Sequence, residues 1–199
     1  MDKFMLTLLL LTKLQFKLLN QEIEKVFNEM SSSEGKSKHF DKRIKKIVEY
    51  HDFLLDFVNR INDVFSEGLL VYVIIIVLSM CIQMYIVSTE HSLMALMKPL
   101  FYLTNAMIQY IFCYCLPAQA VTDEADRTTE YAYFSRWYEN PSSAKVAQLM
   151  ILGRSQRKTY ILAGGIVKID LETCLKTIRT MVSYAMFIRT MGIGQDQTR

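Results

Sequence analysis

The sequence predicts an all-α membrane protein built as a helical bundle. From Leu69 to Val87 the chain has no charged side chain, and a helix needs roughly 20 apolar residues to cross the hydrocarbon core of a bilayer. A second charge-free stretch runs from Pro99 to Thr122. The composition, 51% hydrophobic and 22% charged, implies that membrane segments alternate with substantial aqueous portions.

Residues 1–30 start with the apolar run FMLTLLLLT at 4–12, which covers about half of a membrane span. A signal peptide is the alternative, but no small-residue cleavage site follows the run. Apolar residues then recur at near-helical spacing, at Leu14, Leu18, Ile23 and Phe27. We therefore expect the inner part of a membrane helix that continues into water, with Met1 opening in the middle of an element.

Residues 31–43 form a polar cytoplasmic loop that contains the segment SSSEGKSK. A basic cluster extends from this loop into the next segment, at Lys36, Lys38, Lys42, Arg43, Lys45 and Lys46. Contacts with nucleic-acid phosphates would be one explanation. A cytoplasmic loop beside a membrane span explains the cluster better, and a net charge of +3 is too small to imply a nucleic-acid partner.

Residues 44–88 are expected to form one long helix that starts in water and ends in the membrane. Its first part has apolar positions at helical spacing, namely Ile44, Ile47, Val48, His51, Leu54, Leu55, Val58, Ile61 and Phe65. The charge-free run that follows is rich in β-branched residues, so a buried strand is the alternative. The length of the run argues against a strand, since strands usually end after about 5–6 residues.

Residues 89–98 are a short extracellular connection, and residues 99–122 are expected to cross the membrane again. Pro117 lies near the far end of this span, where it should kink or end the helix. Residues 123–158 are polar with an aromatic patch of Tyr131, Tyr133, Phe134, Trp137 and Tyr138. Such a patch is typical either of an interfacial belt or of a packed cytoplasmic subdomain.

Residues 159–191 hold the last helix, which begins after the interruption Ala163-Gly164-Gly165. Four charges form a stripe on one face of it, at Lys168, Glu172, Lys176 and Arg179. A charge at the bilayer centre costs at least roughly 2.5–3.5 kcal/mol. The stripe therefore favours equally a soluble amphipathic helix or a helix that enters the membrane beside an aqueous path.

Lys and Arg are concentrated in the connections 31–48 and 123–158, whereas the connection 88–98 carries Lys98 alone. The positive-inside rule then places the first and third connections in the cytoplasm and the second outside. If the last helix crosses, the tail at 192–199 is extracellular. We expect a multi-pass protein of the cell membrane.

The sequence contains no motif that indicates catalysis, cofactor binding or metal binding. Cys113 and Cys115 are two residues apart and point in different directions on a helix, so they cannot bridge. The cysteines Cys81, Cys113 and Cys115 lie in apolar runs, where small packing residues are expected. The three histidines have no metal-ligand spacing, and no nucleophile or phosphate-loop motif is present. We expect no enzyme, no cofactor and no metal.

Several motifs in the second half occur in a specific order. They are Tyr114-Cys115 with Pro117-Ala118, Tyr133…Trp137-Tyr138, Arg154-Ser155-Gln156, Ala163-Gly164-Gly165, Leu171-Glu172-Thr173 and Ser183-Tyr184…Ile188-Arg189. Upstream stand His51, Asn62, Phe65-Ser66 and Leu69-Leu70, with Cys81 further on. Together these resemble the C-terminal region of insect odorant receptors, a seven-transmembrane family, from the inner part of its helix four through its helix seven.

The chain departs from the family pattern at several positions. Ala118 and Ala125 replace a glycine and a serine, Lys158-Thr159 stands where a proline is common, and Cys174 replaces the phenylalanine of a Leu-Glu-Thr-Phe motif. The resemblance covers nearly the whole chain but only the second half of the family. It predicts an in-frame extension upstream of Met1 that encodes three further spans.

The resemblance implies a tuning-type subunit of an odorant-gated, non-selective cation channel. Such a subunit assembles with the olfactory coreceptor as a hetero-tetramer and binds small volatile organic ligands. The alternative is a short membrane fragment without a complete odorant pocket, which acts only in assembly or is inert. An enzyme is not implied, and neither is a nucleic-acid partner.

The resemblance also implies roles for particular residues. The last part of helix seven lines the pore in the family, which makes Val182, Met186, Phe187 and Met191 the pore candidates, with Phe187 and Met191 as the hydrophobic gate. Candidates for the odorant pocket on helix six are Tyr102, Leu103, Met107 and Tyr110. Candidates for the assembly anchor are His51, Tyr133, Trp137 and Arg154. For each of them, ordinary packing between helices is the alternative.

Overall fold

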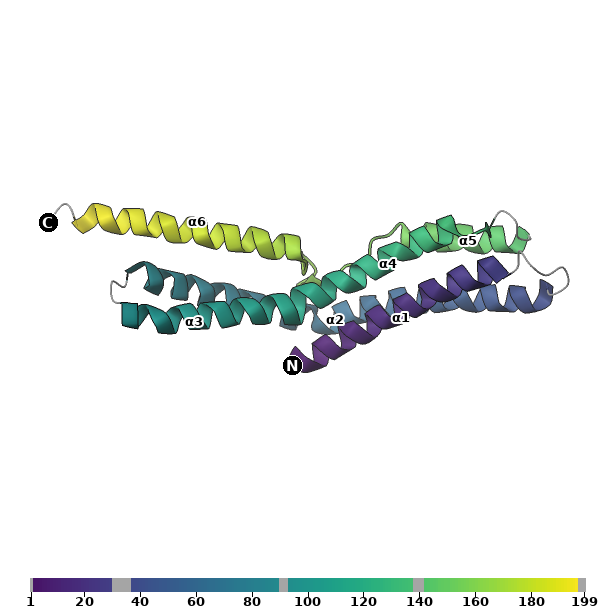
Figure 1. The fold of residues 1–199 in the computed structure, drawn as a ribbon, viewed down its shortest axis with the longest axis horizontal. Helices are drawn as coiled ribbons and strands as arrows, with labels where there is room; N and C mark the ends of the chain where they lie inside the picture. Colours follow the sequence, from purple (N-terminus) through teal and green to yellow (C-terminus); the bar gives the residue numbers. More distant parts are fainter. Residues whose placement is uncertain (1, 30–36, 90–92, 138–141, 197–199) are drawn as a thin grey trace. The chain divides into compact units, whose positions relative to one another are not determined.

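The computed structural model describes residues 2–29, 37–89, 93–137 and 142–196, and these are helical apart from one small hairpin and short connections (Figure 1). The elements are α1 (Asp2–Glu29), α2 (Ser37–Thr89), α3 (Leu93–Tyr110), the π-helix η2 (Ile111–Cys115), α4 (Leu116–Phe134), α5 (Ser142–Ser155), β1 (Leu162–Ala163), β2 (Val167–Lys168) and α6 (Leu171–Asp196). The predicted all-α class is confirmed.

The chain forms two units. Unit 1 comprises Met1–Val64 and Pro117–Ile161, and unit 2 comprises Phe65–Leu116 and Leu162–Arg199. Unit 1 therefore holds α1, the first half of α2, α4 and α5. Unit 2 holds the second half of α2, α3, η2, the β1–β2 hairpin and α6.

The core of unit 1 is formed largely by one face of α1. Its buried side chains recur every three or four residues, at Met5, Leu9, Thr12, Phe16, Leu19, Ile23 and Val26, which is the spacing of one helix face. Leu14 and Leu18, which the sequence pattern placed on one stripe with Ile23 and Phe27, are instead exposed. Because the first half of α1 is apolar on most of its circumference, spacing alone could not identify the inward face.

The first half of α2 supplies the other large part of this core. Ile44, Ile47, His51, Leu54, Leu55, Val58 and Ile61 are buried, as the amphipathic pattern predicted. The helix starts at Ser37, inside the segment expected as a loop, because Phe40 continues the buried stripe by one turn and is itself 4% exposed. Val121 from α4 and Ile151 from α5 complete the interior.

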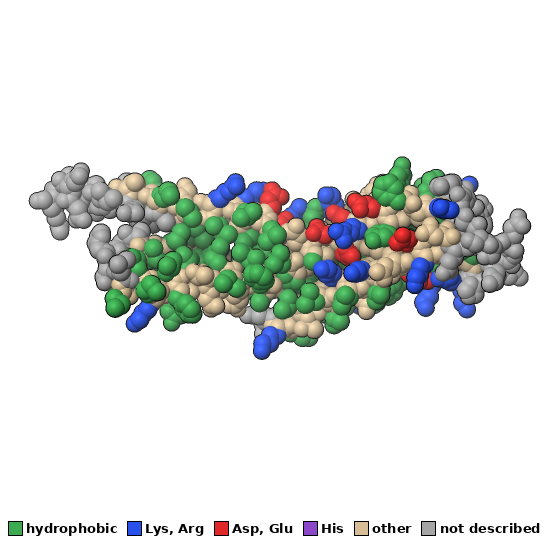
Figure 2. Space-filling view, viewed as in Figure 1, with side chains coloured by type: hydrophobic (Ala, Val, Ile, Leu, Met, Phe, Trp, Pro, Cys, Tyr) green, Lys and Arg blue, Asp and Glu red, His purple; other side chains and the backbone are tan. Residues whose placement is uncertain are grey.

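The second half of α2 is apolar and largely uncovered. Among the described residues, Phe40–Val87 is the helical stretch long and apolar enough to cross a membrane, and little of its most apolar part is buried. Its exposed side chains include Val71, Ile74, Ile75, Leu78 and Ile82. Figure 2 shows hydrophobic side chains gathered over α3 and α6 as well.

The segment expected as the second span, residues 99–122, contains a change of helix type. The backbone N–H of Leu116 bonds to the carbonyl of Ile111, a π-type turn, and the α-helix α4 then runs on to Phe134. Of the two outcomes expected at Pro117, an end of the helix does not occur, and the regular α-helical hydrogen bonding is instead interrupted by the π-type turn directly before it. Its ring would clash with the carbonyl four residues earlier in a regular helix, and the wide turn directly before it relieves that clash.

Candidate functional site

Helix α6, which carries the predicted pore residues, is started by a local cap. The side-chain Oδ1 of Asp170 accepts a hydrogen bond of 2.7 Å from the backbone N–H of Thr173, the arrangement preferred at helix N-termini. Glu172 adds a carboxylate to the first turn, where the positive end of the helix dipole favours it. The start of α6 is thus defined by its own sequence.

The charged stripe near the start of α6 lies on the surface of unit 2. Its members Lys168, Glu172, Lys176 and Arg179 are all exposed. The Nζ of Lys176 lies 2.6 Å from Oε1 of Glu172 one turn earlier, so these two charges compensate each other. The stripe does not take part in the core of the unit.

The pore candidates lie further along the same helix, mostly at the surface of unit 2. Met181 is buried at 8% exposure, whereas Met186 and Phe187 are 65% and 58% exposed, and Val182 is half-buried. Met191 lies on the α6 backbone, and its side chain is outside the described part of the structure. In unit 2, Met186 and Phe187 are therefore apolar side chains without cover from their own unit.

The hairpin before α6 is held against α2 by its glycines. Gly164 and Gly165 lie in the three-residue loop 164–166 between the paired residues Ala163 and Val167. Their φ values of +62° and +69° are left-handed, a conformation that glycine adopts at little cost. The N–H of Gly164 donates to the Ser66 carbonyl at 2.8 Å, and the N–H of Gly165 donates to Ser66 Oγ at 2.9 Å. A Cβ on Gly164 would lie 2.6 Å from Cδ2 of Leu70.

This contact joins two motifs that lie far apart in the sequence. Phe65-Ser66 and Ala163-Gly164-Gly165 were both recognised as family motifs, but nothing in either indicated that they meet. The hairpin leads directly into α6. Ser66 therefore fixes the entry to the candidate pore helix on α2, within unit 2.

The odorant-pocket candidates lie along α3 in different surroundings. Tyr110 is buried at 4% exposure, Leu103 and Met107 are half-buried, and Tyr102 is 62% exposed. The structure thus places Tyr110 in the interior of unit 2 and leaves Tyr102 at its surface. Leu103, Met107 and Tyr110 share one side of the helix by their spacing.

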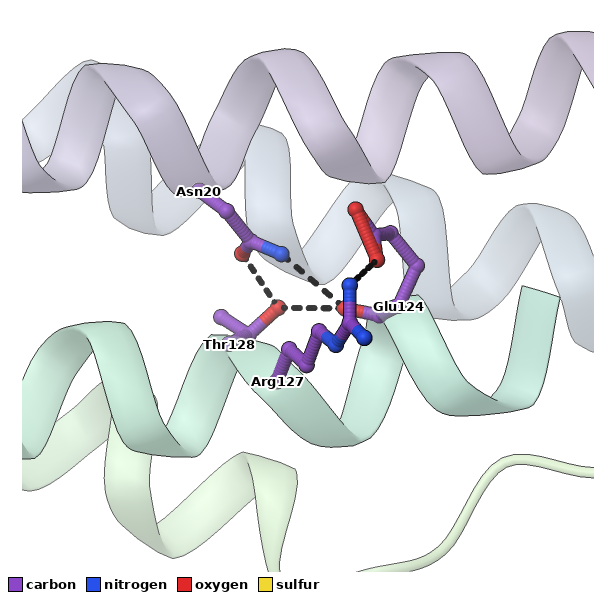
Figure 3. Close-up of polar contacts among 4 residues, drawn as sticks. All are labelled: Asn20, Glu124, Arg127 and Thr128. Atoms are coloured by element: carbon purple, nitrogen blue, oxygen red, sulfur yellow. Dashed lines mark hydrogen bonds and ion pairs between the residues drawn. The ribbon is translucent and has the colours of Figure 1, made fainter. Parts of the chain in front are cut away.

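A polar cluster in unit 1 was not anticipated from the sequence (Figure 3). Asn20 of α1 donates from Nδ2 to the backbone carbonyl of Glu124 at 3.0 Å and accepts at Oδ1 from the hydroxyl of Thr128 at 2.7 Å. The Glu124 carboxylate is paired with Nη1 of Arg127 at 3.2 Å. Asn20 and Thr128 are 1% and 0% exposed, so this cluster links α1 to α4 inside the core.

A signal for this cluster does exist in the sequence. Asn20 lies next to Leu19 and between Phe16 and Ile23, on the face of α1 that the structure buries. A polar amide on an apolar helix face needs a hydrogen-bonding partner when it is buried. The inward face of α1 had to be known before that signal could be used.

The four anchor candidates fall into two pairs in unit 1. Arg154 of α5 reaches α2, with Nε 2.7 Å from Oδ1 of Asp52, next to His51. Trp137 donates from Nε1 to the Tyr133 carbonyl at 3.2 Å. His51 is 2% exposed, whereas Tyr133 is 61% exposed. Tyr138, which was predicted to join the aromatic patch, lies outside the described residues.

Burial decides the protonation of His51. Loss of hydration lowers its pKa from 6.5 to about 4, and the nearby Arg154 acts in the same direction against the opposing effect of Asp52. The ring is therefore neutral at physiological pH. Its Nε2 has no hydrogen-bonding partner among the described residues.

Unit 1 also contains an open cavity of about 450 Å³ between the end of α1 and the end of α4. Its lining is Glu24, Asn28, Arg127, Glu130, Tyr131, Phe134 and Ser135. Three of these side chains carry charge, which does not suit an apolar volatile molecule. None of the odorant-pocket candidates lines this cavity. No group of three or more potential metal ligands occurs in the described part of the chain.

Comparison with known proteins identifies the fold. The chain is similar to a solved structure of the insect olfactory receptor OR5 from Machilis hrabei in complex with eugenol, with a TM-score of 0.81 and 16% sequence identity. The match covers 96% of this chain and 47% of the solved one. At this identity the similarity establishes the fold alone.

The relatives found by sequence are also odorant receptors. Odorant receptor 85b of Drosophila melanogaster is 25% identical over 180 residues, which are 89% of this chain and 44% of that protein. Odorant receptor Or1 of Anopheles gambiae is 22% identical over 152 residues, 75% of this chain and 36% of that protein. The chain thus spans less than half the length of these curated relatives.

A family model described as 7tm Odorant receptor matches residues 1–182. That match covers most of the chain, from α1 into α6. It includes the predicted motifs at Ser66, Trp137 and Gly164. Members of this family are membrane receptors, in agreement with the apolar half of α2. The chain belongs to the insect odorant receptor family.

Proposed function

We propose that this chain is part of a tuning subunit of an odorant-gated, non-selective cation channel, and that it holds the assembly anchor and the pore helix. The observation that carries the proposal is the arrangement of α6. Its start is capped and fixed on α2 through Ser66, while Met186 and Phe187 further along lie exposed on its outer side.

An apolar helix face without cover suits a pore shared between subunits. One helix cannot enclose a pore, so pore-lining side chains must be exposed in the isolated chain. A ring of such side chains closes a channel by dewetting. Val182, Met186, Phe187 and Met191 would take this role, with Phe187 and Met191 at the constriction.

Unit 1 would supply the contact with other subunits. Tyr133 is exposed beside Trp137, and Arg154 is held on α2 by Asp52. His51 is buried beside the Arg154 contact, so we assign it a supporting role beneath the surface. The partner would be the olfactory coreceptor in a hetero-tetramer, with the C-terminus of this chain outside the cell.

The odorant would bind beside α3 in the membrane. Tyr102, Leu103, Met107 and Tyr110 provide apolar and aromatic surface of the kind that small organic ligands prefer. The similar solved receptor holds eugenol, which makes eugenol a reasonable first probe. Residues outside this chain would complete the pocket, since the curated relatives are more than twice as long.

The test is co-expression of the chain with an insect olfactory coreceptor and recording of cation current under a panel of volatiles that includes eugenol. We expect current beyond that of the coreceptor alone. Phe187→Ala should raise the current in the absence of odorant, because a smaller side chain weakens the dewetted constriction. Ile75→Ala, at an exposed position on α2, is the matched control and should leave the current unchanged.

A second function competes with this one. If the chain reaches the surface in complex with the coreceptor but adds no odorant-evoked current, it acts in assembly only. The 62% exposure of Tyr102 favours this alternative, because an uncovered side chain is not yet part of an enclosed pocket. Sequencing of transcripts across Met1 also distinguishes the two proposed functions. The channel proposal expects an upstream extension that encodes three additional spans.

A further inference from the structure

The cavity of unit 1 adjoins the polar cluster of Figure 3 at the ends of two helices. From α1 it is lined by Glu24 and Asn28, which follow Asn20 at intervals of four residues and so share its side of the helix. The lining residues from α4 are Arg127, Glu130, Tyr131, Phe134 and Ser135. All of them belong to unit 1, so the cavity is formed within one unit.

Two carboxylates of the lining are not compensated by other side chains. Glu24 and Glu130 are exposed, and within the described part of the chain neither side chain forms an ion pair or a hydrogen bond. The positive charge of Arg127 is directed at Glu124, whose Oε2 lies 3.2 Å from Nη1 (Figure 3). Glu124 is 6% exposed and does not line the cavity. The cavity therefore has an excess of negative charge.

The neutral polar groups of the lining can also accept hydrogen bonds. Ser135 is 5% exposed, and its hydroxyl donates to the Ala132 carbonyl at 2.8 Å. Its oxygen lone pairs are therefore left to accept a hydrogen bond. The amide of Asn28 can present its oxygen as well. A lining of this kind suits a ligand that brings donors and positive charge, and guanidinium and ammonium groups carry donors only.

Two aromatic rings complete the lining. Tyr131 is half-buried, whereas Phe134 is 80% exposed, so much of its ring is uncovered in unit 1. The face of an aromatic ring attracts a cation within about 6 Å, and a planar guanidinium group also stacks on it. Carboxylates together with aromatic rings therefore favour an organic cation. A metal ion is not favoured, because no cluster of three or more potential ligands occurs among the described residues.

We propose that this cavity is a binding site for an organic cation, with the guanidinium group as the chemistry that it fits. Glu24 and Glu130 pair with the charge, and the rings of Tyr131 and Phe134 cover the face of the cation. The volume of about 450 Å³ lies in the range of small-molecule sites, roughly 300–1,000 Å³. Two sources supply such a group, a free cytosolic compound or an arginine side chain of a neighbouring subunit. The assignment does not depend on the proposed channel function.

The test is binding of N-acetyl-arginine methylamide to the full chain in a neutral detergent, measured by saturation-transfer NMR of the ligand. The matched ligand is N-acetyl-citrulline methylamide, which keeps the shape of the side chain and loses the charge. We expect saturable binding of the arginine compound, weakened by added salt, and about tenfold weaker binding of the citrulline compound. Equal affinity for the two compounds, or no binding of either, would overturn the proposal.

Variants locate the binding to this cavity. Glu24→Gln with Glu130→Gln should weaken the arginine compound about tenfold. Glu49→Gln with Glu67→Gln is the matched control, because it makes the same change in net charge at exposed positions of α2 outside the cavity. Equal weakening in both double variants would contradict the site. Phe134→Leu alters an exposed side chain and spares the core, and it should weaken binding by about two- to fivefold. Wild-type affinity in this variant would exclude the aromatic contact.

The same probe in the complex with the coreceptor identifies the source of the cation. If a neighbouring subunit supplies it, the probe should bind the complex more weakly than the chain alone. A benzophenone side chain at position 134 should then cross-link to an arginine-bearing segment of the coreceptor. If a free compound supplies it, the probe should bind the complex and the chain alone equally. Both results require the cation site and differ only in its occupant.

Discussion

Unit 1 and unit 2 share the helix α2 but differ in what they bury. In the described part of the chain, the buried polar residues all belong to unit 1, namely Thr12, Asn20, His51, Glu124, Thr128, Ser135, Gln148 and Ser155. Unit 2 buries mainly apolar side chains and two thiols, and it leaves the apolar surface of α2 and α3 uncovered.

The difference is the one expected if unit 1 lies mainly in water and the apolar part of unit 2 lies in lipid. In water, burial of apolar area drives packing, and a core can hold polar groups as long as they are hydrogen-bonded. In lipid, apolar contacts between helices gain little, so a few close contacts and hydrogen bonds hold helices together. Figure 2 shows the contrast, with charged side chains over α4 and hydrophobic ones over α3 and α6.

The largest expected effect comes from two neighbouring leucines on α1. Leu19 is 2% exposed and Leu18 is 57% exposed. Leu19→Ala should lower the free energy of unfolding in detergent by about 2–5 kcal/mol, because it leaves a cavity. Leu18→Ala should change it by less than about 0.5 kcal/mol. Similar losses for both would mean that unit 1 does not pack through this face.

A pH titration tests the buried histidine of unit 1. The pKa of His51 is lowered to about 4 in the folded chain, so between pH 6.5 and 4 the unfolded chain binds the extra proton. Stability should fall as the pH drops through this window, by up to about 3 kcal/mol in total. Unfolding measured at pH 7 and pH 4.5 should show this loss, and His51→Gln should reduce it. An unchanged pH dependence in the variant would contradict the assignment.

The polar cluster of Figure 3 can be tested with two threonines of α4. Thr128→Val removes the hydroxyl that Asn20 Oδ1 accepts from and should cost about 1–3 kcal/mol, because a buried acceptor loses its partner. In the described part of the chain, the Thr122 hydroxyl donates to the Ala118 carbonyl of its own helix, so Thr122→Val should cost about 0.5 kcal/mol or less. Thermal unfolding of the two variants compares them directly.

The smallest expected effect separates the two glycines of the hairpin in unit 2. Both need a positive φ, so alanine at either should cost roughly 1 kcal/mol. Only at Gly164 would the new Cβ also meet Leu70. Hydrogen exchange at the N–H of residue 165 should therefore be faster in Gly164→Ala than in the wild type. Protection equal to that of the wild type would show that Ser66 does not hold the hairpin.

The sequence predicted the inward face of α2 correctly because polar residues mark its opposite side over many turns. It failed on α1, where Leu14 and Leu18 are as apolar as the residues that are buried. At Pro117 it left a kink and an end of the helix both open, since the propensity of proline to disturb a helix carries no information about a compensating π turn. The spacing of apolar residues therefore identified the buried face only where a helix is apolar on one side.

The candidate site was predictable in its parts but not in its contacts. The motifs around Ser66 and Gly164 were both recognised, yet a single sequence does not indicate that their backbones meet. The exposure of Phe187 agrees with a pore role but does not test it.

The account depends most on α6 as the pore helix. Single cysteines at Phe187 and, as a control, at Ile75 on α2 can be treated with a charged, membrane-impermeant thiol reagent during odorant-evoked current, in the complex with the coreceptor. We predict that Phe187→Cys is labelled and its current blocked while the channel is open, and that Ile75→Cys is unaffected. Robust current that the reagent leaves unchanged at position 187, or blocks equally at both positions, would contradict this role.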